Sequence, residues 1–178
     1  EEVCKKLERD NDLHYTPAQI CISTGAKQAL YNAVMTLCDP GDEIIVPKPC
    51  WVSYVEMIKL AGGVPVLVET NDDFSLNTAN IQAAVTEKTK AILINSPNNP
   101  TGAVYDRESI LRLGKIVVQY DLYVISDEIY EKLIYGTAEH VSIASVSNEL
   151  YQRTVVINGF SKAYSMTGWR IGYSASSP

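Results

Sequence analysis

Short apolar runs alternate along the chain with longer amphipathic stretches. The apolar runs, such as Ala91-Ile92-Leu93-Ile94, are nearly continuous, which is typical of strands that are covered on both faces. They predict seven strands, at residues 19–24, 43–47, 64–69, 90–95, 122–126, 154–158 and 170–174. Between them, apolar residues recur at helical spacing and predict helices at residues 26–37, 52–61, 78–85 and 107–120.

This alternation predicts an α/β fold with a mostly parallel seven-stranded sheet and helices on both faces. The connection at residues 162–168 is too short for a parallel crossover, so the last strand is expected to run antiparallel. The chain begins within a helical pattern and stops just after a strand-like run, so we expect it to be a piece of a longer protein.

Composition narrows the class of protein. With 178 residues, 46% of them hydrophobic and 20% charged, the chain has the composition of one globular domain. A net charge of -6 argues against a nucleic-acid partner, and no apolar run approaches the ~18 residues of a membrane span. Four cysteines without a C-x-x-C pair and only two histidines predict no metal site and favour a reduced, cytoplasmic setting.

Polar and aromatic residues follow five of the seven predicted strands. In an open α/β sheet, ligands bind beyond the carboxyl ends of the strands, so these residues are expected to gather at one edge. They are Gly25-Ala26-Lys27, Pro49-Cys50-Trp51, residues 95–102, Asp127-Glu128-Ile129-Tyr130 and Gly159-Phe160-Ser161-Lys162.

Two of these segments have both a structural and a ligand-binding interpretation. Gly25-Ala26-Lys27 lies between a strand and a helix, where free N–H groups suit a phosphate, but for this segment alone an ordinary tight turn is the favoured interpretation. No G-x-G-x-x-G or G-K-[ST] motif supports a dinucleotide or P-loop site. The proline-containing loop around Asn99 is rigid, so it either forms a turn only or presents the Asn99 amide to a ligand oxygen.

Asp127 follows a strongly apolar strand, where an unpaired charge is costly. It is therefore a salt-bridge or helix-cap residue, or the counter-ion of a protonated ring nitrogen. Tyr130, three residues later, either faces the same site or packs in the core.

Lys162 is a solvated side chain or, if partly desolvated near another cation, an amine nucleophile toward a carbonyl. Arg170, expected at the start of the last strand, either pairs with a surface acid or binds a phosphate through its guanidinium. Trp51 either packs in the core or covers the face of a ring.

Together these residues resemble the class I (fold type I) aminotransferases that use pyridoxal 5'-phosphate (PLP), with the closest likeness to bacterial aspartate aminotransferases. The most specific match is the segment from Gly159 to Gly172, GFSKAYSMTGWRIG, which fits the family's lysine signature at every restricted position. Residues 96–102 (SPNNPTG) and 126–130 (SDEIY) occur in the expected order and spacing. The resemblance covers the whole chain.

The resemblance implies a catalytic set of Lys162, Asp127 and Tyr130. Lys162 would form a Schiff base with the cofactor and then act as the acid and base that moves a proton, while Asp127 would keep the pyridine nitrogen protonated. Tyr130 and Asn99 would bond the phenolic oxygen, and Trp51 would stack on the ring. The phosphate would be held by the remaining cofactor residues, namely Gly25, Ala26, Lys27, Ser161 and Arg170.

Two departures from the family pattern matter. Gly159 stands where many relatives carry a serine that binds the phosphate, so Ser161, or the backbone amides with Arg170, would serve instead. Lys27 stands where many relatives have Asn or Thr. We hypothesise that Lys27 contacts the distal carboxylate of a substrate, which favours dicarboxylic substrates of the aspartate and glutamate type.

The resemblance further implies that residues 1–178 form the PLP-binding large domain, without the family's N-terminal segment and small domain. The parent protein would be a homodimer that exchanges an amino group between an amino acid and a 2-oxo acid, and this chain alone would be weakly active or inactive. Alternatives are a PLP-dependent lyase, another aminotransferase specificity, or the PLP-binding effector domain of a transcription regulator.

Overall fold

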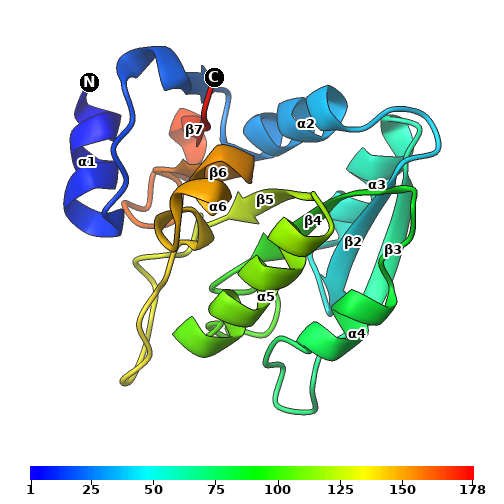
Figure 1. Cartoon of the computed structure of the whole chain (residues 1–178). Coiled ribbons are helices and arrows are strands. Elements are labelled where there is room, and N and C mark those ends of the chain that lie inside the picture. Colours follow the sequence, from blue (N-terminus) through cyan, green and yellow to red (C-terminus); the bar gives the residue numbers. More distant parts are fainter.

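A computed structural model describes all residues 1–178, and its centre is one seven-stranded sheet in the order β1-β7-β6-β5-β4-β2-β3 (Figure 1). The strands are β1 (Ile20–Ser23), β2 (Glu43–Lys48), β3 (Val64–Glu69), β4 (Thr89–Asn95), β5 (Tyr123–Asp127), β6 (Thr154–Gly159) and β7 (Gly172–Ala175). Neighbouring strands from β3 to β6 pair in parallel, whereas β7 is antiparallel to both β6 and β1. The predicted fold and the antiparallel last strand are therefore confirmed.

Six helices accompany the sheet: α1 (Glu2–Asn11), α2 (Ala26–Leu37), α3 (Val52–Leu60), α4 (Thr78–Ala83), α5 (Arg107–Gln119) and α6 (Asn148–Arg153). The four helices predicted between the strands are present with small differences at their ends. The short α6 was not predicted, because six residues are too few to display a helical period.

Alternate residues of the central strands enter two separate cores, which explains the continuous apolar runs. Ile44 and Val46 pack with α2 and α3 on one face, whereas Ile45 packs with α4 and α5 on the other. Both faces are thus buried, as parallel sheets require. A third cluster, which includes Leu7 of α1 and Tyr173 of β7, fixes α1 beside the β6–β7 end of the sheet (Figure 1).

The last strand differs from its predicted bounds. Strand pairing begins at Gly172, not at Arg170, because Arg170 has a left-handed backbone (φ 53°) directly after a 3-10 turn, η3 (Thr167–Trp169). A residue in that conformation cannot continue a strand. Arg170 therefore belongs to the loop that crosses the carboxyl edge of the sheet.

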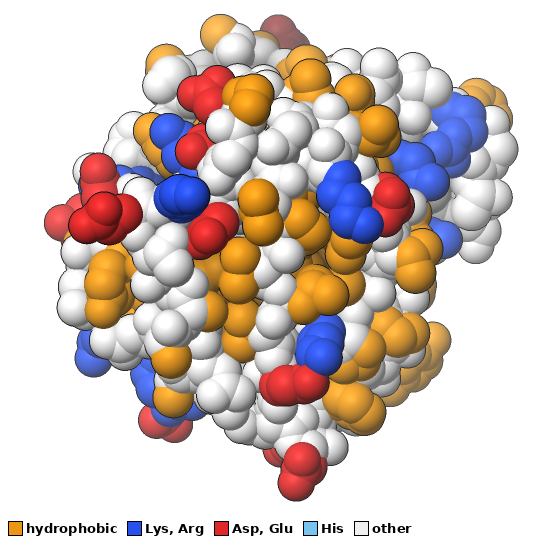
Figure 2. Space-filling view, turned by 90° about the vertical axis from the view of Figure 1, so that its right-hand side faces the viewer, with side chains coloured by type: hydrophobic (Ala, Val, Ile, Leu, Met, Phe, Trp, Pro, Cys, Tyr) orange, Lys and Arg blue, Asp and Glu red, His pale blue; other side chains and the backbone are white.

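The edge strand β3 and the neighbouring helix α3 carry exposed hydrophobic side chains among charged ones (Figure 2). Those of α3 and β3 are Val52, Leu60, Val64 and Leu67. None of the helices combines the length and the apolar character needed to cross a membrane.

Candidate active site

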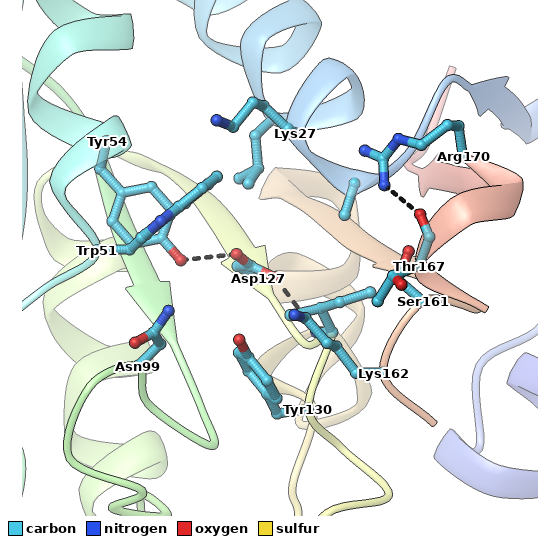
Figure 3. Close-up of a pocket in the computed structure, with 13 residues that line it drawn as sticks. Lys27, Trp51, Tyr54, Asn99, Asp127, Tyr130, Ser161, Lys162, Thr167 and Arg170 are labelled. Carbon is cyan, nitrogen blue, oxygen red and sulfur yellow. Dashed lines mark hydrogen bonds between the residues drawn. The ribbon is translucent and has the colours of Figure 1, made fainter. Parts of the chain in front are cut away.

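A cavity of about 270 Å³ opens at the carboxyl ends of the strands, where the sequence predicts a ligand site (Figure 3). Nine of the ten predicted site residues line it: Ala26, Lys27, Trp51, Asn99, Asp127, Tyr130, Ser161, Lys162 and Arg170. The tenth, Gly25, lies directly behind the wall, against Arg170. Four further lining residues were not predicted: Leu30, Tyr54, Ile129 and Thr167.

One end of the cavity is the N-terminus of α2. The Gly25 carbonyl accepts the N–H groups of Gln28 and Ala29, at 3.1 and 3.3 Å, whereas the N–H groups of Ala26 and Lys27 have no partner in the chain. Free N–H groups at a helix start, together with the helix dipole, attract an anion. This end of the cavity is therefore suited to a phosphate.

Two glycines make this end possible. Gly25 has a positive φ of 84°, and a Cβ atom there would overlap the guanidinium of Arg170. A Cβ atom on Gly172 would overlap the backbone of Ala26, so only glycine lets β7 approach the helix start. Arg170 Nη1 donates to the carbonyl of Thr167 at 2.8 Å, which holds the guanidinium beside the free amides.

Asp127 forms the floor of the cavity at the end of β5. One carboxylate oxygen accepts the Tyr54 hydroxyl at 2.6 Å, and the other accepts the Ile129 N–H at 3.2 Å. No lysine, arginine or histidine pairs with it. Burial raises the pKa of Asp127 to about 6, although the two hydrogen bonds oppose that shift. The salt-bridge alternative for Asp127 is therefore not found, and the carboxylate has no cation in the chain.

Tyr54 is the hydrogen-bond partner of Asp127 in the cavity wall, and sequence reasoning missed it. It follows Trp51 by three residues, which places both on one face at the start of α3, and their rings meet edge to face at 5.5 Å. Burial and the charge of Asp127 raise the pKa of Tyr54 well above its ordinary value, so it remains a hydrogen-bond donor. The helical spacing from Trp51 was the available signal.

The loop that carries Asn99 is tied to the Asp127 strand through Asn95. Asn95 Oδ1 accepts the Asn99 N–H at 2.7 Å, and Asn95 Nδ2 donates to the Asp127 carbonyl at 2.9 Å. Asn95 is 3% exposed, so this bridge is fixed within the core. Asn99 is thereby held at the rim, with its side chain directed into the cavity (Figure 3).

Lys162 and Tyr130 face each other across the cavity, with Lys162 Nζ 5.6 Å from the centre of the Tyr130 ring. Lys162 is exposed to the open cavity, so the partial desolvation considered for it is not found. Phe160, two residues before Lys162, packs against Tyr173 and Tyr164. The side-chain amine of Lys162 has no hydrogen bond or ion pair in the chain, which leaves it free to react.

Gly159 departs from the family pattern for a steric reason. A Cβ atom there would lie 2.8 Å from the Ile171 carbonyl oxygen and 3.0 Å from Gly172 Cα. A serine at position 159 would therefore require the β6–β7 pair to move apart. Ser161 supplies the hydroxyl that lines the cavity instead.

Glu128, the neighbour of Asp127, points away from the cavity into a closed network. One of its oxygens accepts the hydroxyls of Ser126 and Ser142 at 2.8 and 2.7 Å, and the other lies 3.0 Å from His140 Nε2. Burial alone raises the pKa of Glu128, but the charge and hydrogen bond of His140 and the hydroxyl donors lower it further, so the net pKa is below its usual value. Glu128 is therefore a structural carboxylate.

The family model for class I and II aminotransferases matches residues 1–178. The aspartate aminotransferases of Geobacillus stearothermophilus and Bacillus subtilis are 52% and 51% identical to the chain over 177 residues, which is 98% of this chain and 45% of each relative. The chain thus spans slightly less than half the length of these curated relatives.

Solved structures agree with the sequence relatives. The aspartate aminotransferase of Thermus thermophilus, determined with maleate, has a TM-score of 0.94 at 46% identity and matches 99% of this chain and 46% of that one. The aromatic aminotransferase of Pyrococcus horikoshii has a TM-score of 0.95 at 43% identity, over 98% and 48% of the two chains. With a family model matching its full length, the chain belongs to the class I and II aminotransferase family.

Proposed function

We propose that residues 1–178 act as the cofactor-binding large domain of a PLP-dependent aminotransferase, which exchanges an amino group between an amino acid and a 2-oxo acid. The observation that carries the proposal is one cavity that brings together a free amine, Lys162, a carboxylate without a cation, Asp127, and an anion-binding helix start. Aminotransferases of this family are PLP enzymes in general.

The donor set fits PLP at three points. The free N–H groups of Ala26 and Lys27, with Arg170, suit the phosphate, and the cation-free Asp127 suits a protonated ring nitrogen. The indole of Trp51 offers a flat surface for stacking on the ring. A cavity of about 270 Å³ is near the lower end of the range for small-ligand sites.

When bound, PLP supplies an electron-withdrawing ring that stabilises negative charge at the substrate carbon. Lys162 would hold the cofactor carbonyl carbon through its amine, with loss of water, and would later take up and return a proton of the substrate. Asp127 keeps the ring nitrogen protonated, because a buried carboxylate is stabilised by a cation beside it. Tyr130 and Asn99 donate hydrogen bonds to the phenolic oxygen of the cofactor.

Lys27 supports a dicarboxylic substrate class as part of the proposal. Its ammonium lies 4.8 Å above the centre of the Trp51 ring, at the mouth of the cavity, and makes no ion pair. A cation so placed suits the second carboxylate of an aspartate-type substrate. In the PLP-loaded protein, Lys27→Ala should weaken binding of a four-carbon dicarboxylate about tenfold relative to a monocarboxylate, the scale of one charge-assisted hydrogen bond. Equal losses for both ligands would exclude this role, and the exposed Lys115→Ala serves as the control.

The assembly is part of the proposal. The domain would work in the cytoplasm as part of a homodimer, and the chain alone would transaminate weakly or not at all. Sedimentation of the chain with and without PLP measures the dimer. An assay of 2-oxo acid against ammonia separates transamination from a lyase reaction.

The central test is absorption spectroscopy after addition of PLP and removal of the excess, followed by borohydride reduction and peptide mass analysis. We expect a new visible band and a pyridoxyl group on Lys162 alone. Lys162→Ala should lose both, whereas Lys115→Ala should retain both. A pyridoxyl group spread over exposed lysines, with no visible band, would contradict the proposed site.

A further inference from the structure

Tyr130 occupies a tight turn whose two end residues are both buried carboxylates. The Glu131 N–H donates to the Glu128 carbonyl at 3.0 Å, which closes a four-residue turn with Ile129 and Tyr130 at its centre. The Leu133 N–H then donates to the Tyr130 carbonyl at 2.7 Å. Glu128 and Glu131 are 1% and 8% exposed, whereas the Tyr130 ring projects into the cavity (Figure 3). The direction of the ring therefore depends on how the two carboxylates are held.

Glu128 is held from its own side of the chain, by Ser126, His140 and Ser142. The carboxylate oxygens of Glu128 and Glu131 and a ring nitrogen of His140 all lie within 4.8 Å of one another. Two carboxylates this close repel each other in a buried setting, so the turn requires a second cation besides His140.

That cation comes from α1, more than a hundred residues away in sequence. Lys6 Nζ forms an ion pair with Glu131, and Asn11 Nδ2 donates to Glu131 at 2.9 Å. Asn11 Oδ1 also accepts from Lys6 at 2.7 Å, which closes a three-residue clamp. A second ion pair joins the same two segments, with the acidic residue now on α1: Asp10 pairs with Lys132 at 2.9 Å. The side chain of Lys6 is 16% exposed, so solvent screens the clamp only weakly.

We propose that Lys6 and Asn11 of α1, acting through Glu131, are positioning residues for Tyr130. The clamp sets the turn at residues 128–131 and thereby the place of the Tyr130 hydroxyl in the cavity. This inference rests on the proposed PLP site, because the hydroxyl acts there on the cofactor. It gives α1, which does not line the cavity, a defined contribution to the site.

The test compares Lys6→Met and Glu131→Gln with the conservative Lys6→Arg. The matched control is Glu2→Gln, which removes the exposed Lys5–Glu2 pair from the same helix. Without cofactor, hydrogen exchange is measured at the amides of Glu131 and Leu133, which close the turn. With PLP, the measurements are its dissociation constant and the pH at which the visible absorption of the bound cofactor changes.

We expect Lys6→Met and Glu131→Gln to speed exchange at the two turn amides, to shift the absorption midpoint and to weaken PLP binding about tenfold, the scale of one hydrogen bond to a charged group. Exchange in β4 should not change, and Lys6→Arg and Glu2→Gln should match the parent chain. Glu131→Gln retains a partner for Asn11 and decides the matter where Lys6→Met fails to fold.

Turn amides or a cofactor spectrum unchanged in Glu131→Gln would overturn the positioning role. Absence of PLP from Lys162 in the parent chain would instead refute the proposed function, and the exchange data would still decide whether α1 holds the turn.

Discussion

Asp127 and Glu128 are neighbours in sequence and are equally buried, yet their surroundings are opposite. Glu128 receives two hydroxyl donors and pairs with His140, whereas Asp127 receives one hydroxyl and one backbone N–H and has no cation. The pKa of Glu128 is accordingly lowered, and burial raises the pKa of Asp127 to about 6. Burial is common to both, so the partner decides whether a carboxylate stabilises the fold or is available to a ligand.

Asp127 and Glu128 therefore contribute to the free energy of folding with opposite sign. A carboxyl pKa raised from 3.8 to about 6 costs about 3 kcal/mol of stability above pH 6, because the folded state resists the charge that the unfolded chain accepts freely. The Glu128 network meets no such cost while His140 is protonated. Asp127 therefore destabilises the fold until a cation binds beside it, whereas Glu128 already has its partners.

The largest effect is predicted for loss of the cation that pairs with Glu128. His140→Leu leaves Glu128 buried without its cation and should lower the free energy of unfolding by about 3–5 kcal/mol, measured by urea denaturation at pH 6. The raised pKa of His140 gives stability that is present below its unfolded value and is lost as the pH rises through the folded value. The difference between parent and variant should therefore shrink at alkaline pH.

His14→Leu is the matched control, because His14 also faces a glutamate, Glu8 at 3.4 Å, but both side chains are largely exposed. It should change the free energy of unfolding by less than about 0.5 kcal/mol. Equal decreases in the free energy of unfolding for the two variants would mean that burial does not strengthen the Glu128–His140 pair.

The second prediction concerns removal of the buried charge of Asp127. Asp127→Asn should stabilise the PLP-free chain by about 1–3 kcal/mol at pH 8, because the variant no longer buries a charge. The stability cost of Asp127 is absent below pH about 4 and grows as the pH rises to about 6, so the gain should vanish at pH 4. Addition of PLP should reverse the order, since the variant lacks a counter-ion for the ring nitrogen.

Thermal denaturation at the two pH values, with and without PLP, measures all four states. Asp72→Asn, at an exposed position, should alter none of them. A PLP-free Asp127→Asn chain that is less stable than the parent at pH 8 would show that the buried charge of Asp127 carries no net cost to folding.

The fold was predictable because the central strands lack polar interruptions. Runs such as Ala91-Ile92-Leu93-Ile94, bounded by polar residues, favour strands with two buried faces, and the segment after Lys162 is too short for a parallel return. The bounds of the last strand were wrong because the left-handed backbone of Arg170 leaves no trace in an apolar pattern. The edge of the sheet at which the site lies followed from the α/β alternation, because ligands bind beyond the carboxyl ends of the strands in such a sheet.

The site was predictable where residues follow strands, and not where they reach it from elsewhere. Asp127, at the end of β5, and Lys162, after β6, were identified from their position at the strand ends, whereas Tyr54 enters from α3. The family resemblance assigned the roles, because spacing alone left Asp127 open to a salt bridge. The partition between Asp127 and Glu128 depends on His140 and Ser142, whose contacts arise only in the folded chain.

The third prediction concerns the hydroxyl that Asp127 does possess. Tyr54→Phe removes its shortest hydrogen bond, at 2.6 Å, and should cost about 1–2 kcal/mol of unfolding free energy at pH 8. Because that bond lowers the pKa of Asp127, its loss should raise the pKa further above about 6. Carboxyl NMR titration measures the shift, and the exposed Tyr120→Phe is the control. An unchanged Asp127 pKa would assign the hydrogen bond no electrostatic role.

The smallest predicted effect is the loss of one of the two hydroxyl groups that donate to Glu128. Ser142→Ala removes one of two hydroxyls from the same Glu128 oxygen and leaves that of Ser126, so we expect a loss of about 1 kcal/mol by urea denaturation at pH 7. Ser53→Ala, which removes a hydroxyl without a hydrogen bond in the chain, should leave stability within about 0.5 kcal/mol. The lowered pKa of Glu128 gives stability that is lost as the pH falls through its folded value, and Ser142→Ala should move that loss to higher pH. A loss as large as that of His140→Leu would mean that the hydroxyl, and not the imidazolium, separates Glu128 from Asp127.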